Sequence, residues 1–266
     1  MNRTELLDRA ASDGEARLLL ARVLDKLEQT GRKSVPSHTA FLSPGERVDV
    51  ERLLAAAGHP RCLFTGGYEG AERTVCVFLP DWQEEEDFLA DENGPLTALR
   101  CTWREEDTLT HRDLLGALMA QGITREKVGD ILVRGSGCDV ILLRELEGYL
   151  RENFTGAGRV RFLSAVSIPL TQVVPPEGKK ELIRDTVAAL RLDAVTAAGF
   201  RLSRGKAAEA IAAGRVQLNY KECLKSDRTV AAGDVISCRG LGKCRFLESP
   251  GASKKGRIIV VLERYL

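Results

Sequence analysis

The chain has 266 residues, and its 39 Lys+Arg side chains almost balance its 38 Asp+Glu side chains, which gives a formal net charge of +1. Hydrophobic residues make up 44% and charged residues 29%, a composition typical of globular proteins and not of disordered or fibrous chains. The length allows one large domain or two to three small ones.

The charges are divided unevenly along the chain. Residues 179–266 carry 18 basic and 9 acidic side chains, a balance of +9. Residues 1–178 carry the other 21 basic and 29 acidic side chains, a balance of −8. Such an asymmetry indicates that the C-terminal part is a separate module that binds a polyanion.

Secretion and metal binding are not indicated by the sequence. The first apolar stretch, residues 18–21, lies between two arginines and is too short for a signal-peptide core or a membrane span. The seven cysteines are an odd number and include no CxxC pair, which argues against a zinc site or a disulfide framework. We therefore expect a cytoplasmic protein with reduced thiols, no metal and no membrane contact.

The first part of the chain has helical patterns. Leucines and valines recur at helical spacing over residues 18–27. A second helix is predicted from Ser43 to about residue 57, because Ser43 can cap it, Pro44 suits its first turn and Glu46 completes a capping box. We assign residues 1–68 to an N-terminal helical region.

The pattern changes after residue 70. The run 74–79 predicts a buried strand, and the acidic run 84–87 predicts a solvated loop. Thr110 and Asp113 predict the start of a helix. The further elements expected are strands at 96–103, 131–134, 138–142 and 160–166 and helices at 114–121 and 143–154. This order contains a βαββαβ unit, which predicts a ferredoxin-like or RRM-like domain over residues 69–170.

A linker is predicted over residues 171–180, because Pro175 and Pro176 favour extended chain and the charge balance changes sign there. Residues 181–266 then form the C-terminal domain. Its predicted elements are helices at 190–199, ending at Gly199, and at 203–214, and strands at 215–219 and from 233. The fold class expected for the whole chain is α+β.

The start of the second C-terminal helix favours RNA binding. Ser203 can cap the helix, and Arg204 and Lys206 lie in its first turn, where the helix dipole favours anions. A bound RNA phosphate would offset the unfavourable placement of these cations. The alternative is that both are solvated surface cations, tolerated at a small cost.

Motifs in this region resemble the S4 domain, a small RNA-binding module. They are Arg191-Leu192-Asp193, Ser203-Arg204-x-x-Ala207, Ile211-x-x-Gly214-x-Val216-x-Leu218-Asn219 and Gly233-Asp234-x-Ile236. Residues 109–131 and the tail Lys254-Lys255-Gly256-Arg257 resemble the bacterial YlmH family. This second resemblance covers most of the chain and is strongest from residue 109 onward.

The resemblance implies a cytosolic, non-enzymatic RNA-binding protein of the ribosome quality-control type, with an RRM-like domain and an S4 domain. The partners it implies are large-subunit ribosomal RNA, the tRNA of a stalled peptidyl-tRNA and other quality-control factors. Members of the family support C-terminal alanine tailing of the stalled chain, and an older family label links them to cell division. We expect a monomer with no cofactor.

The resemblance also implies RNA contacts at particular positions. By family position and charge, the candidates are Arg191, Ser203, Arg204, Lys206, Arg215, Gln217, Asn219, Lys221, Arg239, Lys254, Lys255 and Arg257. Relatives often carry Ser or Arg where this chain has Gly205, so no side-chain contact is expected there.

The sequence contains no recognisable set of catalytic residues that would support an enzymatic function. His111-Arg112-Asp113 is similar to a kinase catalytic loop, but the asparagine that this loop requires is replaced by Leu118. The principal alternative is a pseudouridine synthase that uses its S4 domain to bind substrate, because Arg191-Leu192-Asp193 is similar to a motif of those active sites. Only 73 residues follow Asp193, too few for a further catalytic domain. A protein-interaction adaptor acting through the acidic N-terminal half is another alternative.

The central domain lacks the aromatic platform of RNA-binding RRM sheets, since aromatic residues make up only 5% of the chain. Phe162 could stack on a base, although a position in the core is the simpler interpretation. Arg159 and Arg161 alternate with apolar residues and predict a basic face that could meet phosphate.

Overall fold

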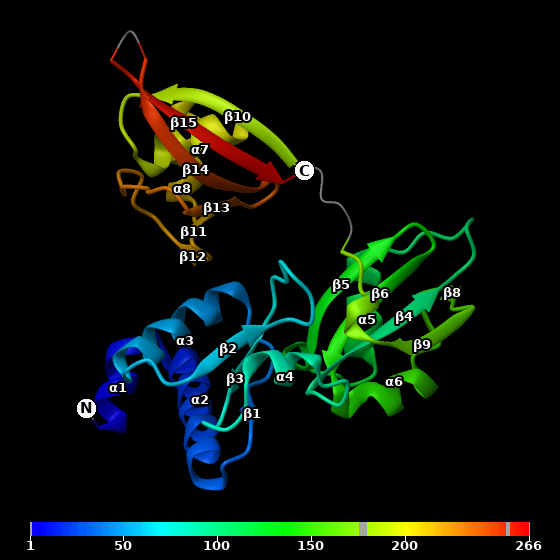
Figure 1. The fold of residues 1–266 in the computed structure, drawn as a ribbon. Helices are drawn as coiled ribbons and strands as arrows, with labels where there is room; N and C mark the ends of the chain where they lie inside the picture. The colour runs from blue at the N-terminus through cyan, green and yellow to red at the C-terminus, as the bar shows by residue number, and fades with distance from the viewer. Residues whose placement is uncertain (1, 176–179, 254–255, 266) are drawn as a thin grey trace. The chain divides into compact units, whose positions relative to one another are not determined.

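The computed structural model describes residues 2–175, 180–253 and 256–265. These residues form two compact units that divide between Pro176 and Glu177 (Figure 1). Each unit mixes helices with antiparallel sheet, as expected for the α+β class.

The N-terminal part of the first unit combines helices with a small sheet. Its elements are α1 (Arg3–Ala10), α2 (Gly14–Lys33), β1 (Ser37–His38), α3 (Pro44–Ala56), β2 (Cys62–Thr65) and β3 (Val75–Phe78). The capping box predicted for α3 is confirmed, since Ser43 Oγ accepts from the Glu46 N–H and Glu46 Oε2 accepts from the Ser43 N–H. The helical region predicted over residues 1–68 contains three helices, and it also contains the strands β1 and β2, which the sequence did not predict.

The sequence predicts that the strand at 74–79 belongs to the RRM-like domain, and this prediction is wrong. β3 lies between β1 and β2 in a three-stranded antiparallel sheet, and all four of its residues pair with β2. The expected boundary at 68/69 therefore separates two paired strands. The run is continuously apolar because both faces of β3 are buried, and such a run does not show which sheet a strand joins.

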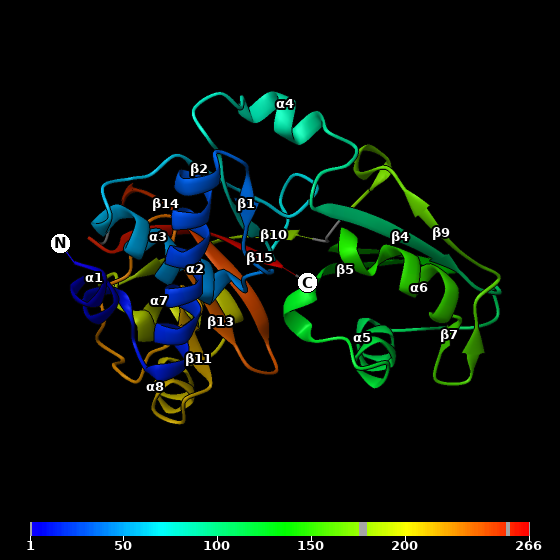
Figure 2. The same cartoon turned by 90° about the horizontal axis from the view of Figure 1, so that it is seen from below.

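The predicted βαββαβ unit is present in the rest of the first unit. Its elements are β4 (Leu96–Thr102), α5 (His111–Ala120), β5 (Val128–Arg134), β6 (Gly137–Leu143), α6 (Glu147–Asn153) and β9 (Ser164–Ile168). The strands form a sheet in the order β5-β6-β4-β9 with all neighbours antiparallel. This arrangement is ferredoxin-like, and Figure 2 shows α5 and α6 along one face of the sheet.

Smaller elements of this unit differ from expectation in two places. Part of the acidic run is helical, in α4 (Glu85–Ala90), although its carboxylates are exposed as predicted. The strand expected at 160–166 is interrupted: β8 (Val160–Arg161) pairs with β7 (Gly156–Ala157) in a separate hairpin, and β9 begins only at Ser164. The 3₁₀ turns are η1 (Arg125–Lys127), η2 (Arg144–Leu146) and η3 (Leu170–Gln172).

The two sheets of the first unit pack against each other. Val75 and Val77 of β3 belong to one buried cluster with Ala98 of β4 and Ile141 of β6. On the opposite face of β3, Cys76 and Phe78 pack against α2 and α3. The opposite face of the RRM-like sheet packs against α5 and α6. The first unit is therefore a stack of helices, sheet, sheet and helices.

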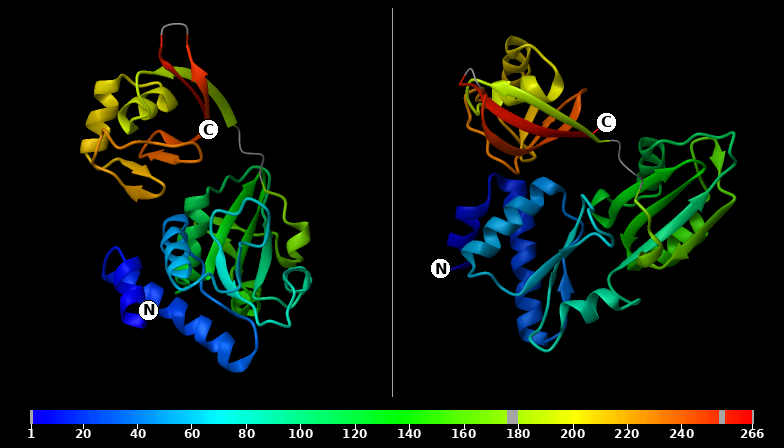
Figure 3. Two further views of the ribbon diagram at one scale, coloured as in Figure 1. Left: turned by 60° about the vertical axis from the view of Figure 1, so that its left-hand side comes forward. Right: turned by 45° about the horizontal axis from the view of Figure 1, so that its top comes forward.

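The C-terminal unit has a six-stranded sheet in the order β10-β15-β14-β13-β11-β12. Its elements are β10 (Lys180–Val187), α7 (Leu192–Phe200), α8 (Arg204–Ala212), β11 (Val216–Leu218), β12 (Lys221–Glu222), β13 (Val235–Cys238), β14 (Gly242–Ala252) and β15 (Ile258–Tyr265). Figure 3 shows β10 and β15 side by side, as their eight paired positions require.

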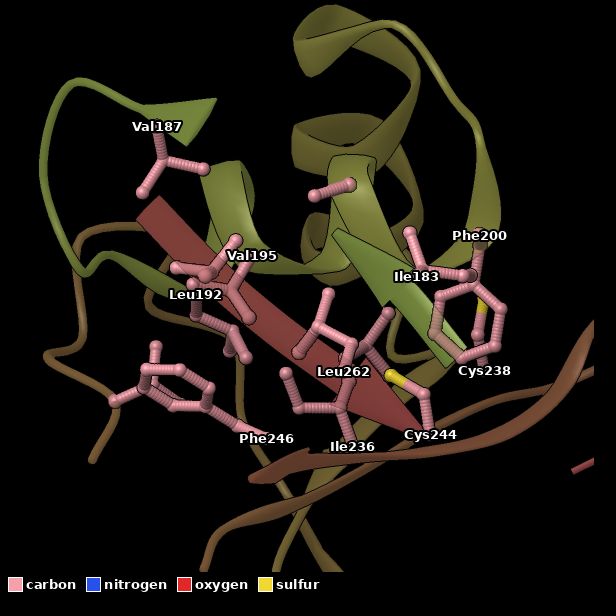
Figure 4. Packing of buried hydrophobic residues seen from close by; sticks show 14 of the residues in the cluster. Ile183, Val187, Leu192, Val195, Phe200, Ile236, Cys238, Cys244, Phe246 and Leu262 are labelled. Carbon is pink, nitrogen blue, oxygen red and sulfur yellow. The ribbon is translucent and has the colours of Figure 1, made fainter. Parts of the chain in front are cut away.

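One hydrophobic core joins the two helices of this unit to the sheet. Figure 4 shows Ile183 of β10 and Val195 of α7 in the same cluster as Phe246 and Leu262 of the sheet. The predicted helix end at Gly199 is wrong, because α7 continues to Phe200 and Arg201 ends it with a left-handed φ of 54°. Gly199 serves packing instead: a Cβ there would lie 2.7 Å from Cys244 Sγ.

We expect Gly199→Val to destabilise the C-terminal unit by about 1–3 kcal/mol, because the added side chain has no room beside β14. Gly205→Ala is the matched control, since a Cβ at Gly205 in α8 would meet no atom within 4 Å. That change should stabilise the unit by about 0.4–1 kcal/mol. Urea unfolding followed by circular dichroism measures both, and equal effects would contradict the packing role of Gly199.

Candidate nucleic-acid interface

The first turns of α7 and α8 are joined by one buried carboxylate. Asp193 accepts from Arg191 Nε at 3.2 Å and Arg191 Nη2 at 3.2 Å, and from Arg204 Nε at 3.1 Å. The Asp193 side chain is only 6% exposed, whereas the side chains of Arg191 and Arg204 are 39% and 55% exposed. Asp193 thus holds two guanidinium groups together at the surface.

The charge on Asp193 is stabilised by these partners. Burial alone would raise the pKa of Asp193, but the hydrogen bonds and charges of Arg191 and Arg204 outweigh burial and hold the pKa below its usual value. The carboxylate also supplies the anion that the start of α8 lacks in its own sequence. Of the two alternatives that the sequence left open for Arg204, a bound phosphate or simple solvation, neither accounts for the partner observed, which is Asp193; contact of Arg204 with phosphate stays a prediction.

Lys206 differs from Arg204. It is exposed, and no ion pair to Lys206 occurs among the residues that the structure describes. Ser203 caps α8 as predicted, because its Oγ accepts from the Lys206 N–H at 3.2 Å. The open end of the helix and the ammonium group of Lys206 together can receive a phosphate.

A second cationic pair lies at the end of β11 and β13. Val216 pairs with Cys238, and the Arg239 N–H donates to the Arg215 carbonyl at 2.8 Å, so Arg215 and Arg239 are cross-strand neighbours. Both side chains are exposed, as is that of Gln217 two residues further along β11. This edge can contact a polyanion through two guanidinium groups.

The structure gives Asn219 a role within the fold. Asn219 and Tyr220 form the two-residue loop between β11 and β12, both with positive φ. The Asn219 side chain accepts from the Val235 N–H at 2.9 Å and donates to Asp234 Oδ1 at 2.8 Å. Both polar atoms of the Asn219 side chain are thus hydrogen-bonded within the fold. The sequence predicts an RNA contact for this side chain, and that contact stays a prediction. Lys221 follows the loop and is half-buried.

The basic tail is only partly described. Lys254 and Lys255 lie outside the described residues. Arg257 donates to the Thr186 carbonyl at 2.7 Å and to Thr186 Oγ1 at 3.1 Å. It lines a groove of about 720 Å³ together with Arg204 and two cations that the sequence reasoning missed, Arg184 and Arg201. The alternation of Arg184 with Ile183 in a strand could have indicated Arg184, whereas no pattern in the sequence indicates Arg201.

The four strands of the RRM-like sheet, all within the described residues, carry no aromatic side chain on which a base could stack. One face is covered by α5 and α6, and the other contacts β3 through Ala98 and Ile141. Phe162 packs on the core instead, with its ring centroid 5.0 Å from that of Phe154. Arg159 and Arg161 are exposed in the β7–β8 region, and their contact with phosphate stays a prediction.

Two further features of the described residues concern metals and membranes. Within residues 2–175, 180–253 and 256–265, no group of three His, Cys, Asp or Glu side chains could hold a metal ion. No helix in this same part of the chain has the length and apolar character to span a bilayer.

The fold and the basic surface define a class: RNA-binding proteins that carry an S4 domain. Residues 190–236 match the model of the S4 domain, and residues 104–171 match a family described as "Putative RNA-binding domain in YlmH". A Bacillus subtilis protein named "Ribosome-associated protein quality control protein P2" is 34% identical over 229 residues, which cover 85% of this chain and 86% of that protein. The chain belongs to the YlmH family.

A solved structure supports the fold. The structure titled "Cell division protein ylmH from Streptococcus pneumoniae" has a TM-score of 0.50 and 20% sequence identity. The similarity covers 62% of this chain and 97% of that one. At this level of identity the likeness concerns the fold alone.

Proposed function

We propose that this chain binds large-subunit ribosomal RNA and the tRNA of a stalled peptidyl-tRNA, and acts in cytoplasmic ribosome quality control without catalysing a reaction. The observation that carries the proposal is the exposed cationic surface of the C-terminal unit. Lys206 lies at the open end of α8, and Arg215 and Arg239 lie together at the edge of the sheet. The name of the Bacillus subtilis relative supports a ribosomal partner.

Alanine tailing is the finer part of this proposal. A protein that binds the phosphates of both ribosomal RNA and tRNA would keep a stalled complex assembled while another factor extends the nascent chain. The role asked of this chain is therefore binding and positioning, and its affinity should come mainly from phosphate contacts.

A pseudouridine synthase is not favoured by the geometry of Asp193. The side chain is nearly buried and both of its oxygens accept from arginines that belong to the same unit. A carboxylate used in this way links α7 to α8 and has no open side toward a substrate. Mass spectrometry of ribosomal RNA and tRNA from cells lacking the protein tests this alternative, since our proposal expects no missing pseudouridine.

We expect binding of the full-length chain to 50S ribosomal subunits to weaken steeply with salt. Neutralising about four phosphates would give a slope of log affinity against log salt near −3 to −4, because bound cations are released from the RNA. A filter-binding titration between about 50 and 200 mM KCl measures the slope. An affinity that stays constant over this range would contradict a phosphate-dominated interface.

A further inference from the structure

The groove that Arg257 lines runs along β10 and has a wall made of consecutive residues. Residues 182–188 form that wall, and Ala194, Ala197 and Ala198 of α7 form the opposite side with Leu202. Four arginines and one aspartate complete the lining: Arg184, Arg201, Arg204, Arg257 and Asp185. The groove thus combines small apolar side chains of α7 with several cationic side chains.

β10 is an edge strand, because it pairs with β15 on one side and with no other strand among the described residues. On the unpaired side of β10, the backbone groups of Thr186 are hydrogen-bonded to side chains. The Thr186 N–H donates to Asp185 Oδ1 at 2.6 Å, and the Thr186 carbonyl accepts from Arg257 Nη2 at 2.7 Å. The outward backbone groups of a strand recur at every second residue. Those of Leu182 and Arg184 therefore point the same way as those of Thr186.

The edge of β10 is open at Leu182 and Arg184. In the described part of the chain, neither a side chain nor a loop donates to or accepts from their backbone groups on that side. Leu182 is 69% exposed, which is unusual for a large apolar residue on a strand edge. The edge can therefore pair with another extended chain.

The chemistry of the groove favours an acidic peptide over RNA. An added strand supplies both the acceptors and the donors that an open edge requires, and its alternate side chains would fit above the alanines of α7. Arg184 has no ion pair among the described residues and favours a carboxylate, whereas Arg201 and Arg204 already pair with Glu181 and Asp193 and add positive charge through their exposed side chains. RNA phosphates could only accept hydrogen bonds, and the lining contains no aromatic side chain on which a base could stack.

We propose that β10 binds an extended, acidic segment of a partner protein as an additional strand. Apolar side chains of the segment alternate with acidic ones, so that one set lies on Ala194, Ala197 and Ala198 and the other meets Arg184. Arg204 lines this groove and also belongs to the proposed RNA surface, whereas Lys206, Arg215 and Arg239 do not line the groove. The proposed site gives the C-terminal unit a protein partner as well.

The probe for this site is a fluorescein-labelled octapeptide in which valine alternates with glutamate, and fluorescence anisotropy with the full-length protein measures its binding. We expect saturable binding that is lost when lysine replaces every glutamate in the peptide. Leu182→Pro removes the outward N–H of β10 and should weaken binding at least tenfold, because proline is tolerated at strand edges whose N–H faces outward. Leu182→Thr keeps that N–H and should bind within twofold of wild type.

A second variant keeps the test decisive if Leu182→Pro does not fold. Ala197→Phe fills the groove from α7, where Ala197 is half-buried, and should also weaken binding at least tenfold. Circular dichroism verifies the fold of each variant. The proposal is overturned if the wild-type protein does not bind the glutamate peptide, or if the folded variants bind it as the wild type does. It is likewise overturned if a twelve-nucleotide oligouridylate, and not the peptide, loses binding in Leu182→Pro and Ala197→Phe.

Discussion

Replacing Lys206 and Arg215 together by glutamate is expected to weaken binding to 50S subunits by about a hundredfold near 100 mM salt. Each substitution removes one proposed phosphate contact and places a negative charge beside the RNA backbone. The slope of log affinity against log salt should fall by about two. Both residues are exposed and neither contributes to a buried cluster, so the free energy of unfolding should stay near that of the wild type.

The control for this variant changes the charge of the other unit by the same amount. Arg9 and Lys33 are exposed in the last turns of α1 and α2, and replacing both by glutamate should alter affinity by less than threefold. Equal losses in the two variants would mean that net charge alone determines binding. Undiminished affinity in the Lys206/Arg215 variant would show that this surface does not contact the RNA.

Asp193→Ala is expected to destabilise the C-terminal unit by about 2 kcal/mol at pH 7. Removing a buried carboxylate from its partners typically costs about 3–5 kcal/mol, but Arg191 and Arg204 are partly exposed and water can solvate them, which lowers the cost. RNA affinity should also fall although the net charge becomes more positive, because the two guanidinium groups lose the group that orients them. In this proposal Asp193 is a positioning residue.

The pH dependence gives this prediction a second readout. Because the pKa of Asp193 is lowered in the folded protein, its contribution to stability is complete above the usual aspartate pKa of about 4 and is lost as the pH falls through the folded value. The stability difference between wild type and Asp193→Ala should therefore shrink on acidification below about pH 4. Asp227→Ala, at an exposed turn, should change stability by less than about 0.5 kcal/mol. A difference that persists unchanged in acid would contradict the ion-pair role.

Local signals in the sequence were sufficient for helix starts. Ser43, Thr110 and Ser203 all cap the helices predicted from them, because a capping hydrogen bond joins residues only three positions apart. The βαββαβ order was also predictable, since its strands and helices alternate along the chain with clear changes of period.

Features that depend on distant residues were not predictable in the same way. The sheet that β3 joins depends on two partner strands that both precede it in the chain, ten or more residues away. Gly199 fits the pattern of a helix stop, although its role is to leave room for Cys244. The same limit applies to the site. Family position identified Arg191 and Arg204 but not the carboxylate that joins them, and it did not predict the two hydrogen bonds by which the Asn219 side chain holds the turn to residues 234 and 235.

The contact between the two sheets of the first unit bears on how such a chain can evolve. An RRM-like fold with an open sheet can be copied, lost or recombined as a module, because nothing else depends on that surface. Here Ala98 and Ile141 bury Val75 and Val77, so any exchange of one sheet would leave apolar surface exposed on the other. Residues 2–175 therefore form one compact unit in which each sheet covers apolar surface of the other, and the chain has two such units.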